Sequence, residues 1–181
     1  MTKFILIRHG KPDYNSVEER NFKGHGCDLA FLSKEGIEQA VNVSKNVILN
    51  NSDMLISSPY TRCMQTASII SNYNNLMING EMDIHEWLPD LSFNYQTYDV
   101  VKDNYKKAIQ DFERGNLNSK QYESIINVKL RALDALKKYL NYSKVIVVTH
   151  GGVIYSLCQQ HVSYCEVVDI EYDGKHLIKS K

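Results

Sequence analysis

Several features are missing from this chain of 181 residues, and each absence excludes a class of protein. Basic and acidic residues number 21 each, so there is neither the basic stripe typical of nucleic-acid-binding proteins nor an acidic tail. No apolar stretch approaches the ~18 residues that a membrane span requires. The first residues show no charged segment followed by a long apolar run and a cleavage site, so no signal peptide is evident. We therefore expect a cytoplasmic protein that binds neither nucleic acid nor a membrane.

Cysteine is scarce, and its spacing does not suit metal or disulfide chemistry. The four cysteines form no Cys-x-x-Cys pair and no zinc-binding pattern. Cys63 and Cys158 fall in predicted helices, where small buried thiols are expected. The chain also offers no carboxylate cluster for a cation. We expect a reduced compartment, no metal and no other cofactor.

The rest of the composition is ordinary for one globular domain. Hydrophobic residues make up 43% and charged residues 23% of the chain. The length lies within the roughly 100–200 residues of a typical domain. We expect residues 1–181 to form a single domain, with an insertion at about 83–118 and with the protein a monomer or a homodimer.

Three apolar runs end in side chains suited to binding an anion. Residues 3–10 read Lys-Phe-Ile-Leu-Ile-Arg-His-Gly, and residues 144–150 repeat this pattern as Lys-Val-Ile-Val-Val-Thr-His. Unbroken apolar runs are typical of strands buried on both faces, and ligands bind at the carboxyl ends of such strands. A third run, residues 54–58, leads through a Ser-Pro turn to an arginine. The side chains expected to converge at this edge are Arg8, His9, Arg62 and His150.

Each of these four side chains has an ordinary structural interpretation as well. A lone histidine after a strand is more often a hydrogen-bonding group, and a lone arginine is usually a solvated charge. The functional interpretation depends on all four holding the same topological position on separate strands.

Elsewhere the chain alternates between predicted helices and strands. A helix is expected from an N-cap at Ser33 to about Asn50, and Pro59 suits the first turn of another. Further helices are expected over residues 119–141 and after Gly152. The predicted buried stripes are Ile37, Ala40, Val41, Ser44, Val47 and Ile48 in the first helix, and Tyr122, Ile126, Leu130 and Leu133 in residues 119–141.

Near the end of the chain, the dipeptide at 173–174 (Asp-Gly) predicts a two-residue hairpin between strands at 167–172 and 175–178. The alternating pattern predicts an α/β fold: a three-layer α/β/α sandwich with a mostly parallel central sheet and one late antiparallel hairpin.

The motifs at 8–10 (Arg-His-Gly), 57–67 (Ser-Ser-Pro-Tyr-Thr-Arg-Cys-Met-Gln-Thr-Ala) and 150–152 (His-Gly-Gly) resemble the histidine phosphatase superfamily, also called the phosphoglycerate mutase-like family. The similarity spans nearly the whole chain and extends to Asn15 and to the Leu-Ser-x-x-Gly sequence at 32–36. The loop at 24–28 lacks the common Gly-Trp pair of the family. The resemblance implies a phosphoglycerate mutase-like fold.

The resemblance also implies a covalent mechanism. His9 would attack phosphorus through a neutral ring nitrogen, while its other nitrogen is held by the backbone near Gly10. Arginine forks suit phosphoryl oxygens, and His150 would be protonated as a third positive donor. The residues expected to bind the phosphoryl group are Arg8, Asn15, Arg62, His150 and Gly151. No metal is required for this chemistry.

Glu86 occupies the position where the family usually places its acid. Trp87 beside it would raise the pKa of the carboxyl by excluding water. Judged by residue type alone, Glu86 would be a surface glutamate in a polar loop, and Asp83 is the alternative acid. His85 is interpreted as structural or solvent-facing.

Residues 89–118 carry several aromatic side chains among many polar ones, namely Phe93, Tyr95, Tyr98, Tyr105 and Phe112. In the resembled fold, the corresponding insertion often lies over the catalytic pocket. These residues would form a substrate wall or lid, or they would pack a small subdomain.

The function that the resemblance implies is a metal-independent phosphomonoesterase acting on a small cytosolic phosphate ester. One alternative is a phosphoglycerate mutase, although Glu86 is followed by Trp-Leu-Pro and not by the Arg-x-Tyr-Gly of mutases. Another is a catalytically inactive phosphate-binding regulatory module, which would be expected to have lost one of the core residues. No rival nucleophile is evident, because Ser57 and Ser58 lack a Gly-x-Ser-x-Gly elbow and Cys63 lacks a phosphatase-type cysteine loop.

Overall fold

The computed structural model describes residues 1–94, 98–116 and 119–179. Its strands are β1 (Thr2–Arg8), β2 (Met54–Ser57), β3 (Ile78–Gly80), β4 (Lys144–Thr149), β5 (Val167–Tyr172) and β6 (Leu177–Lys179). Its α-helices are α1 (Asn15–Glu18), α2 (Lys34–Ser44), α3 (Thr61–Asn74), α4 (Tyr98–Glu113), α5 (Ile125–Lys137) and α6 (Gly151–Cys158). Short 3₁₀ segments are η1 (Gly24–Leu29), η2 (Val47–Leu49) and η3 (Met82–Ile84).

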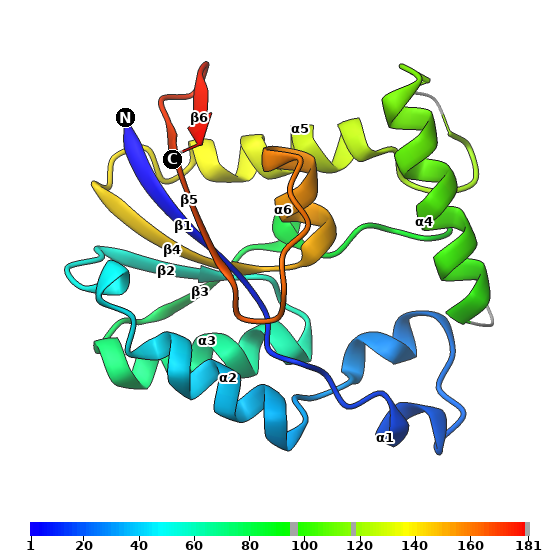
Figure 1. The fold of residues 1–181 in the computed structure, drawn as a ribbon, viewed down its shortest axis with the longest axis horizontal. Helices are drawn as coiled ribbons and strands as arrows, with labels where there is room; N and C mark the ends of the chain where they lie inside the picture. The colour runs from blue at the N-terminus through cyan, green and yellow to red at the C-terminus, as the bar shows by residue number, and fades with distance from the viewer. Residues whose placement is uncertain (95–97, 117–118, 180–181) are drawn as a thin grey trace.

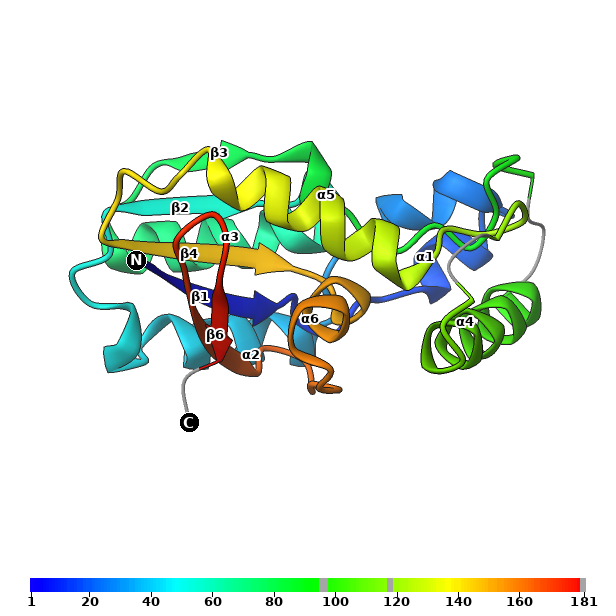
Figure 2. The same ribbon diagram turned by 90° about the horizontal axis from the view of Figure 1, so that it is seen from above.

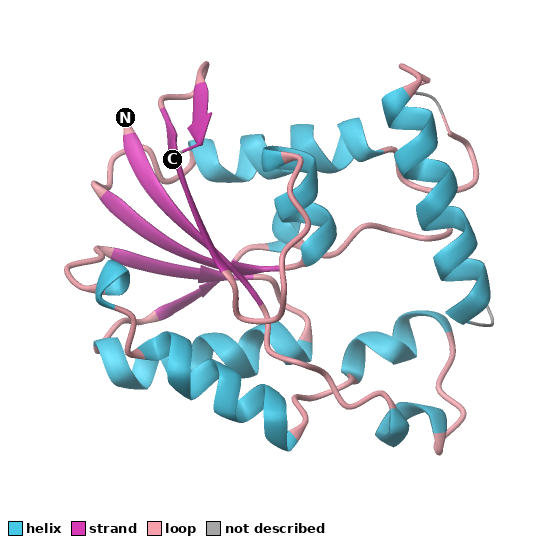
Figure 3. Ribbon diagram, in the orientation of Figure 1, coloured by secondary structure: helices cyan, strands magenta, loops and turns pink. Residues whose placement is uncertain are grey.

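The strands form one six-stranded sheet in the order β3-β2-β4-β1-β5-β6. Strands β1 to β4 pair in parallel, whereas β5 pairs antiparallel with β1, and β6 antiparallel with β5. Helices α2 and α3 lie on one face of the sheet, and α5 and α6 on the other (Figures 1 and 3). The predicted three-layer α/β/α architecture with a mostly parallel sheet is confirmed.

Strand β1 shows why this sheet needs helices on both faces. Phe4 and Leu6 belong to the core shared with α5 and α6, whereas Ile5 and Ile7 belong to the core shared with α2 and α3. All four side chains are fully buried. Successive side chains of a strand point to opposite faces, so an unbroken apolar run supplies both cores at once.

Helix α2 is shorter and turned differently from the prediction. It begins at the predicted cap, where the Ser33 hydroxyl accepts the Gly36 N–H, but it ends at Ser44 and not near Asn50. Ile37 and Val41, which were expected inside, are exposed. A Cβ at Gly36 would lie 2.2 Å from the Lys11 carbonyl oxygen, so the face of α2 that carries Gly36 packs closely against the backbone of residue 11. The buried residues are Gly36, Ala40, Val43 and Ser44.

The helix expected over residues 119–141 is confirmed only at its centre, as α5. Residues 119–124 pair instead with the segment before α4: the Leu91 N–H donates to the Gln121 carbonyl, and the Glu123 N–H donates to the Leu88 carbonyl. Ser124 then caps the helix. Leu130 is exposed, and the buried stripe consists of Ile125, Val128, Ala132, Ala135 and Leu136.

The turns also differ in detail from the predictions. Pro59 precedes α3, whose N-cap is Tyr60. The hairpin between β5 and β6 is confirmed, but its loop has the four residues 173–176, because the Asp173 carboxylate accepts the N–H groups of Lys175 and His176. The long connection between β1 and α2, residues 11–32, contains α1 and η1.

Sequence patterns missed β3 and α4. Helix α4 falls in the predicted insertion, and its Tyr105, Ile109 and Phe112 pack against the core shared with α5 and α6. Tyr95 lies outside the described residues, as does the side chain of Tyr98. Tyr105 and Phe112, two of the aromatic residues of this region, therefore pack against the hydrophobic core of the domain.

The carboxyl ends of the parallel strands meet at one edge. Arg8 pairs with Thr149 in the register of β1 and β4, so the residues that follow them, His9 and His150, leave the sheet side by side. Helices α1 and α4 stand beyond this edge (Figure 2). Within the described part of the chain, no helix is long and apolar enough to cross a membrane.

Candidate active site

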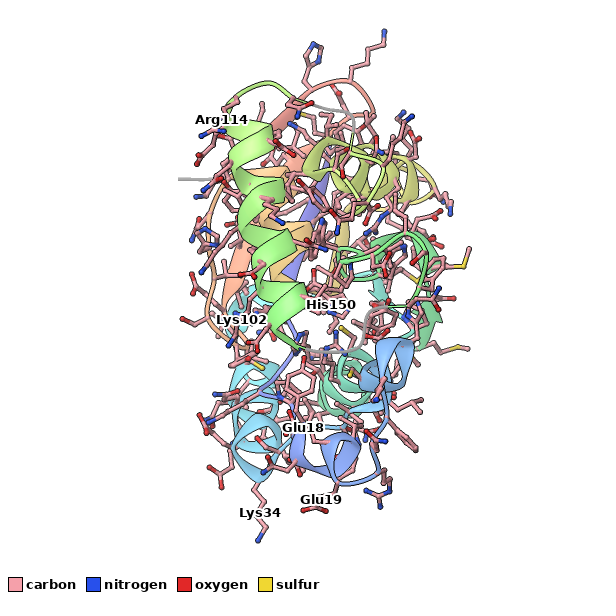
Figure 4. The ribbon with its side chains drawn as sticks, turned by 90° about the vertical axis from the view of Figure 1, so that its right-hand side faces the viewer. Glu18, Glu19, Lys34, Lys102, Arg114 and His150 are labelled. Carbon is pink, nitrogen blue, oxygen red and sulfur yellow. The ribbon has the colours of Figure 1, made fainter. Side chains whose placement is uncertain are left out.

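The four side chains predicted at the sheet edge do come together. The centroids of the His9 and His150 rings are 5.1 Å apart, and Arg62, from the first turn of α3, lies against both rings. Arg8 and His9 share the ring of Tyr164 as a neighbour. His9, Arg62 and His150 are buried. Figure 4 shows His150 between α4, which carries Lys102, and the segment that carries Glu18 and Glu19.

His9 is held as a nucleophile must be held. Its Nδ1 lies 2.8 Å from the Gly10 carbonyl oxygen, which can only accept, so Nδ1 carries the proton. Nε2 is therefore left with its lone pair, and it accepts the Nε–H of Arg62 at 3.3 Å. Burial and the positive charge of Arg62 lower the pKa of His9 well below its ordinary value. The ring is thus neutral at pH 7, with Nε2 as its reactive atom.

The two arginines leave buried donors unused. Arg8 stacks over Tyr164 at 4.0 Å and donates through Nη1 to the Val162 carbonyl at 2.7 Å. Arg8 Nε and Arg62 Nη1 are nevertheless buried without a hydrogen-bond partner among the described residues. Leaving such donors unpaired is costly, and functional sites are one place where this occurs. A tetrahedral oxyanion bound at His9 Nε2 would supply acceptors for both.

Asp28 sets a negative charge beside this cluster. Its Oδ1 lies 3.6 Å from Arg62 Nη1, and its Oδ2 lies 2.8 Å from Nδ1 of His25. Asp28 belongs to η1, in the loop whose sequence departs from the family pattern. Its carboxylate would compete with a bound anion for Arg62.

His150 differs in one respect from the prediction. Its Nε2 lies 2.8 Å from the Ser58 hydroxyl, and its Nδ1 lies 3.5 Å from Arg62 Nη2. The ring was expected to be protonated, but burial and the positive charge of Arg62 lower its pKa well below the ordinary value. His150 is therefore neutral in the protein alone, and an approaching phosphate dianion would raise this pKa.

Glu86 reaches the same cluster from the segment after η3. Its Oε1 accepts the N–H groups of Trp87 at 2.9 Å and Gly152 at 3.1 Å. Its Oε2 lies 3.9 Å from Nδ1 of His150. Burial raises the pKa of this carboxyl, as a proton donor requires. Because Oε1 is occupied as an acceptor, the proton of the neutral acid belongs on Oε2, which faces His150.

Gly152 makes this position of Glu86 possible. A Cβ at residue 152 would lie 2.5 Å from Oε1 of Glu86 and 3.2 Å from the Trp87 Cβ. Any side chain there would push the carboxyl away. The second glycine of the 150–152 motif therefore serves the acid, while Gly151 lies against Arg8, with a Cβ position 3.4 Å from Nε.

Two other candidate residues lie differently. Asn15 is exposed at the start of α1, and its place in the phosphate site stays a prediction. Asp83, the alternative acid, has its Oδ2 3.5 Å from Nζ of Lys138 and is partly exposed. His85 is half-buried and stacks on Tyr60.

Sequence analysis missed several neighbours of the site, namely Asp28, Ser58, Tyr60 and Tyr164. Ser58 alone carried a usable signal, because it follows β2 at the same sheet edge and its N–H donates to the Val148 carbonyl. Tyr60 lies against Arg62, with 5.0 Å between the centroid of the Tyr60 ring and Cζ of Arg62. Within the described residues, no group of three or more His, Cys, Asp or Glu side chains could hold a metal ion.

Comparisons with known proteins agree with this geometry. The model of the histidine phosphatase superfamily (branch 1) matches residues 4–172. Phosphoglycerate mutase-like protein 4 of Arabidopsis thaliana is 28% identical over 165 residues, which cover 87% of this chain and 70% of that protein. The adenosylcobalamin/alpha-ribazole phosphatase of Escherichia coli is 23% identical over 155 residues, covering 82% and 73%.

A solved structure shows the same fold at lower identity. The mycobacterial glucosyl-3-phosphoglycerate phosphatase in complex with VO3 has a TM-score of 0.75 and is 17% identical, covering 99% of this chain and 98% of its own. These similar proteins are named for different reactions and substrates, so likeness to them does not assign a substrate.

Proposed function

Because the chain belongs to the histidine phosphatase superfamily (branch 1), we propose that it is a metal-independent phosphomonoesterase that hydrolyses a small phosphate ester through a phosphohistidine on His9. The observation that carries the proposal is the neutral His9 ring, whose Nε2 accepts the Nε–H of Arg62, in a cluster where the buried donors Arg8 Nε and Arg62 Nη1 have no hydrogen-bond partner among the described residues. Nucleophile and anion-binding groups thus meet at one point. A purely structural histidine would not need these unused charges beside it.

In the first step, His9 Nε2 forms a bond to phosphorus while the bond to the ester oxygen breaks. Arg8 and Arg62 bind the equatorial oxygens, and His150, protonated once the dianion has raised its pKa, donates a third hydrogen bond. The leaving oxygen takes the proton from Oε2 of Glu86, so an alcohol departs and Glu86 becomes a carboxylate.

In the second step, water attacks the phosphorus of the phosphohistidine. The Glu86 carboxylate accepts the proton of this water, while the bond from phosphorus to Nε2 breaks and its electrons return to His9. Inorganic phosphate forms, and His9 and Glu86 regain their starting states. Acid and base are therefore the same residue in opposite steps.

Trapping the intermediate tests the proposal. Rapid quench with ³²P-labelled phenyl phosphate should give acid-labile, base-stable label on the peptide that contains His9. His9→Ala should lose both label and phosphate release. His176→Ala is the matched control, because His176 lies in the exposed hairpin loop and should keep both. Label on another residue, or phosphate release by His9→Ala, would overturn the proposal.

The same preparation separates the alternatives. A phosphatase should release free phosphate from monoesters and should interconvert 2- and 3-phosphoglycerate little. Efficient interconversion that depends on a bisphosphoglycerate primer would instead establish a mutase. Binding of phosphate without turnover of any monoester would establish an inactive module. The single domain over residues 1–181, the cytoplasmic location and the monomer or homodimer remain predictions from the sequence.

A further inference from the structure

We propose that the buried ion pair between Arg131 and Glu123 positions Glu86 for proton transfer, a role that rests on the proposed function. Neither residue is among those that meet the phosphoryl group. Both act through the backbone of residues 83–88, the segment that carries the acid.

All three nitrogens of the Arg131 guanidinium group donate hydrogen bonds, to the Glu123 carboxylate and to the backbone of residues 83–88. Nε and Nη2 donate to the two carboxylate oxygens of Glu123, at 2.7 and 3.0 Å. Nη1 donates to the Asp83 carbonyl at 2.7 Å, and Nη2 also donates to the Glu86 carbonyl at 3.2 Å. The planar fork of arginine can serve all these acceptors at once, whereas a lysine ammonium cannot.

Glu123 fixes the other side of the segment. Its Oε2 accepts the Leu88 N–H at 3.1 Å, and its backbone N–H donates to the Leu88 carbonyl at 3.0 Å. Its carbonyl accepts Nε1 of Trp87 at 2.5 Å. The backbone on both sides of the Glu86 side chain is thus bound to one ion pair, formed by Arg131 in the middle of α5 and Glu123 just before α5.

The anchoring sets the direction of the acid. With the backbone at 86–87 fixed, the N–H groups of Trp87 and Gly152 hold Oε1, and Oε2 is left facing His150. The side chains of Arg131 and Glu123 are only 16% and 8% exposed, so water competes little for these bonds. A shift of the segment by about 1 Å would misplace the proton, and shifts of this size cost about 10²-fold in rate.

A pair of substrates that need the acid to different extents distinguishes positioning from general support. Phenyl phosphate has a basic leaving group, similar to tyrosine with its pKa of about 10, and needs a proton. p-Nitrophenyl phosphate has nearly the same shape but a much better leaving group. kcat/KM reports the first phosphoryl transfer for both. A structural defect would lower the two values equally.

Arg131→Lys should lower kcat/KM for phenyl phosphate about 10- to 100-fold and that for p-nitrophenyl phosphate less than about 3-fold. Arg131→Lys combined with Glu86→Gln should be no slower on phenyl phosphate than Glu86→Gln alone, because the positioned proton is already gone. Arg114→Lys, on the exposed end of α4, is the matched control and should change neither value.

Equal losses on both substrates, or full additivity with Glu86→Gln, would overturn the positioning role. If Arg131→Lys does not fold, Glu123→Gln replaces it in both comparisons, the one between the two substrates and the one with Glu86→Gln. This change keeps the shape of the side chain but removes the charge that binds Arg131. Failure of the proposed function would look different, because either His9→Ala would still release phosphate or the unaltered protein would release none.

Discussion

Glu86→Gln removes the proposed proton donor with almost no change in shape. The amide oxygen can still accept the N–H groups of Trp87 and Gly152, as Oε1 does. The amide nitrogen takes the place of Oε2, 3.9 Å from Nδ1 of His150, and cannot supply a proton. Burial already raises the pKa of Glu86, so a neutral side chain is tolerated at this position. We expect the thermal midpoint to stay the same or to rise slightly.

The catalytic effect should be large and should depend on the leaving group. General acids typically contribute about 10²–10⁴-fold, which corresponds to about 2.7–5.4 kcal/mol of transition-state stabilisation. Glu86→Gln should lose this factor in kcat/KM for phenyl phosphate. For p-nitrophenyl phosphate the loss should stay below about 10-fold, because its leaving group needs little protonation.

The pH profile gives a second measurement. The acid form of Glu86 is the active one in the first step, so kcat/KM for phenyl phosphate should fall as pH rises through its raised pKa. Glu86→Gln should lack this limb. Asp83→Asn is the control, because Asp83 lies beside Lys138, and it should retain both the limb and the rate. Equal losses on the two aryl phosphates, or an unchanged pH limb, would refute the role of Glu86 as the acid.

Three further outcomes are expected. Because the pKa values of His9 and His150 are lowered in the folded protein, the unfolded chain binds more protons than the folded one below about pH 6.5. In urea unfolding, the free energy of unfolding should therefore fall as the pH is lowered, by up to ~1.4 kcal/mol per pH unit for each ring. Alanine at both positions should remove this slope. Asp28→Asn should strengthen inhibition by inorganic phosphate roughly 3- to 10-fold, because a carboxylate no longer competes for Arg62; weaker inhibition would mean that Asp28 supports the arginine. Ser124→Ala should lower the free energy of unfolding by about 1 kcal/mol through loss of the α5 cap, and no change in the urea midpoint would contradict this.

The wrong prediction for the buried face of α2 has a physical cause. The apolar stripe containing Ile37 and Val41 predicted that this face of α2 is buried. In the structure the face that carries Gly36 is buried against Lys11, so Ile37 and Val41 are exposed. Hydrophobic periodicity measures only which side chains would gain from burial. It does not include backbone contacts with distant segments, and these decided how α2 is oriented.

The sequence alone determined the strand-end part of the site. A strand buried on both faces must be apolar throughout, so the place where polarity resumes marks the sheet edge, and this identified Arg8, His9, Arg62 and His150. Resemblance to a family then added Glu86. These features are readable because each depends on neighbours within a few positions along the chain.

Only the tertiary structure decided the protonation state of the site residues and the direction of their side chains. The neutral state of His150 follows from burial beside Arg62, and the direction of the Glu86 carboxyl follows from Gly152 and the ion pair between Arg131 and Glu123. The approach of Asp28 and the exposure of Asn15 depend on how the loop at 11–32 folds back. Electrostatic and hydrogen-bond energies vary with distances of a few ångströms between segments far apart in the chain, and residue order does not specify those distances.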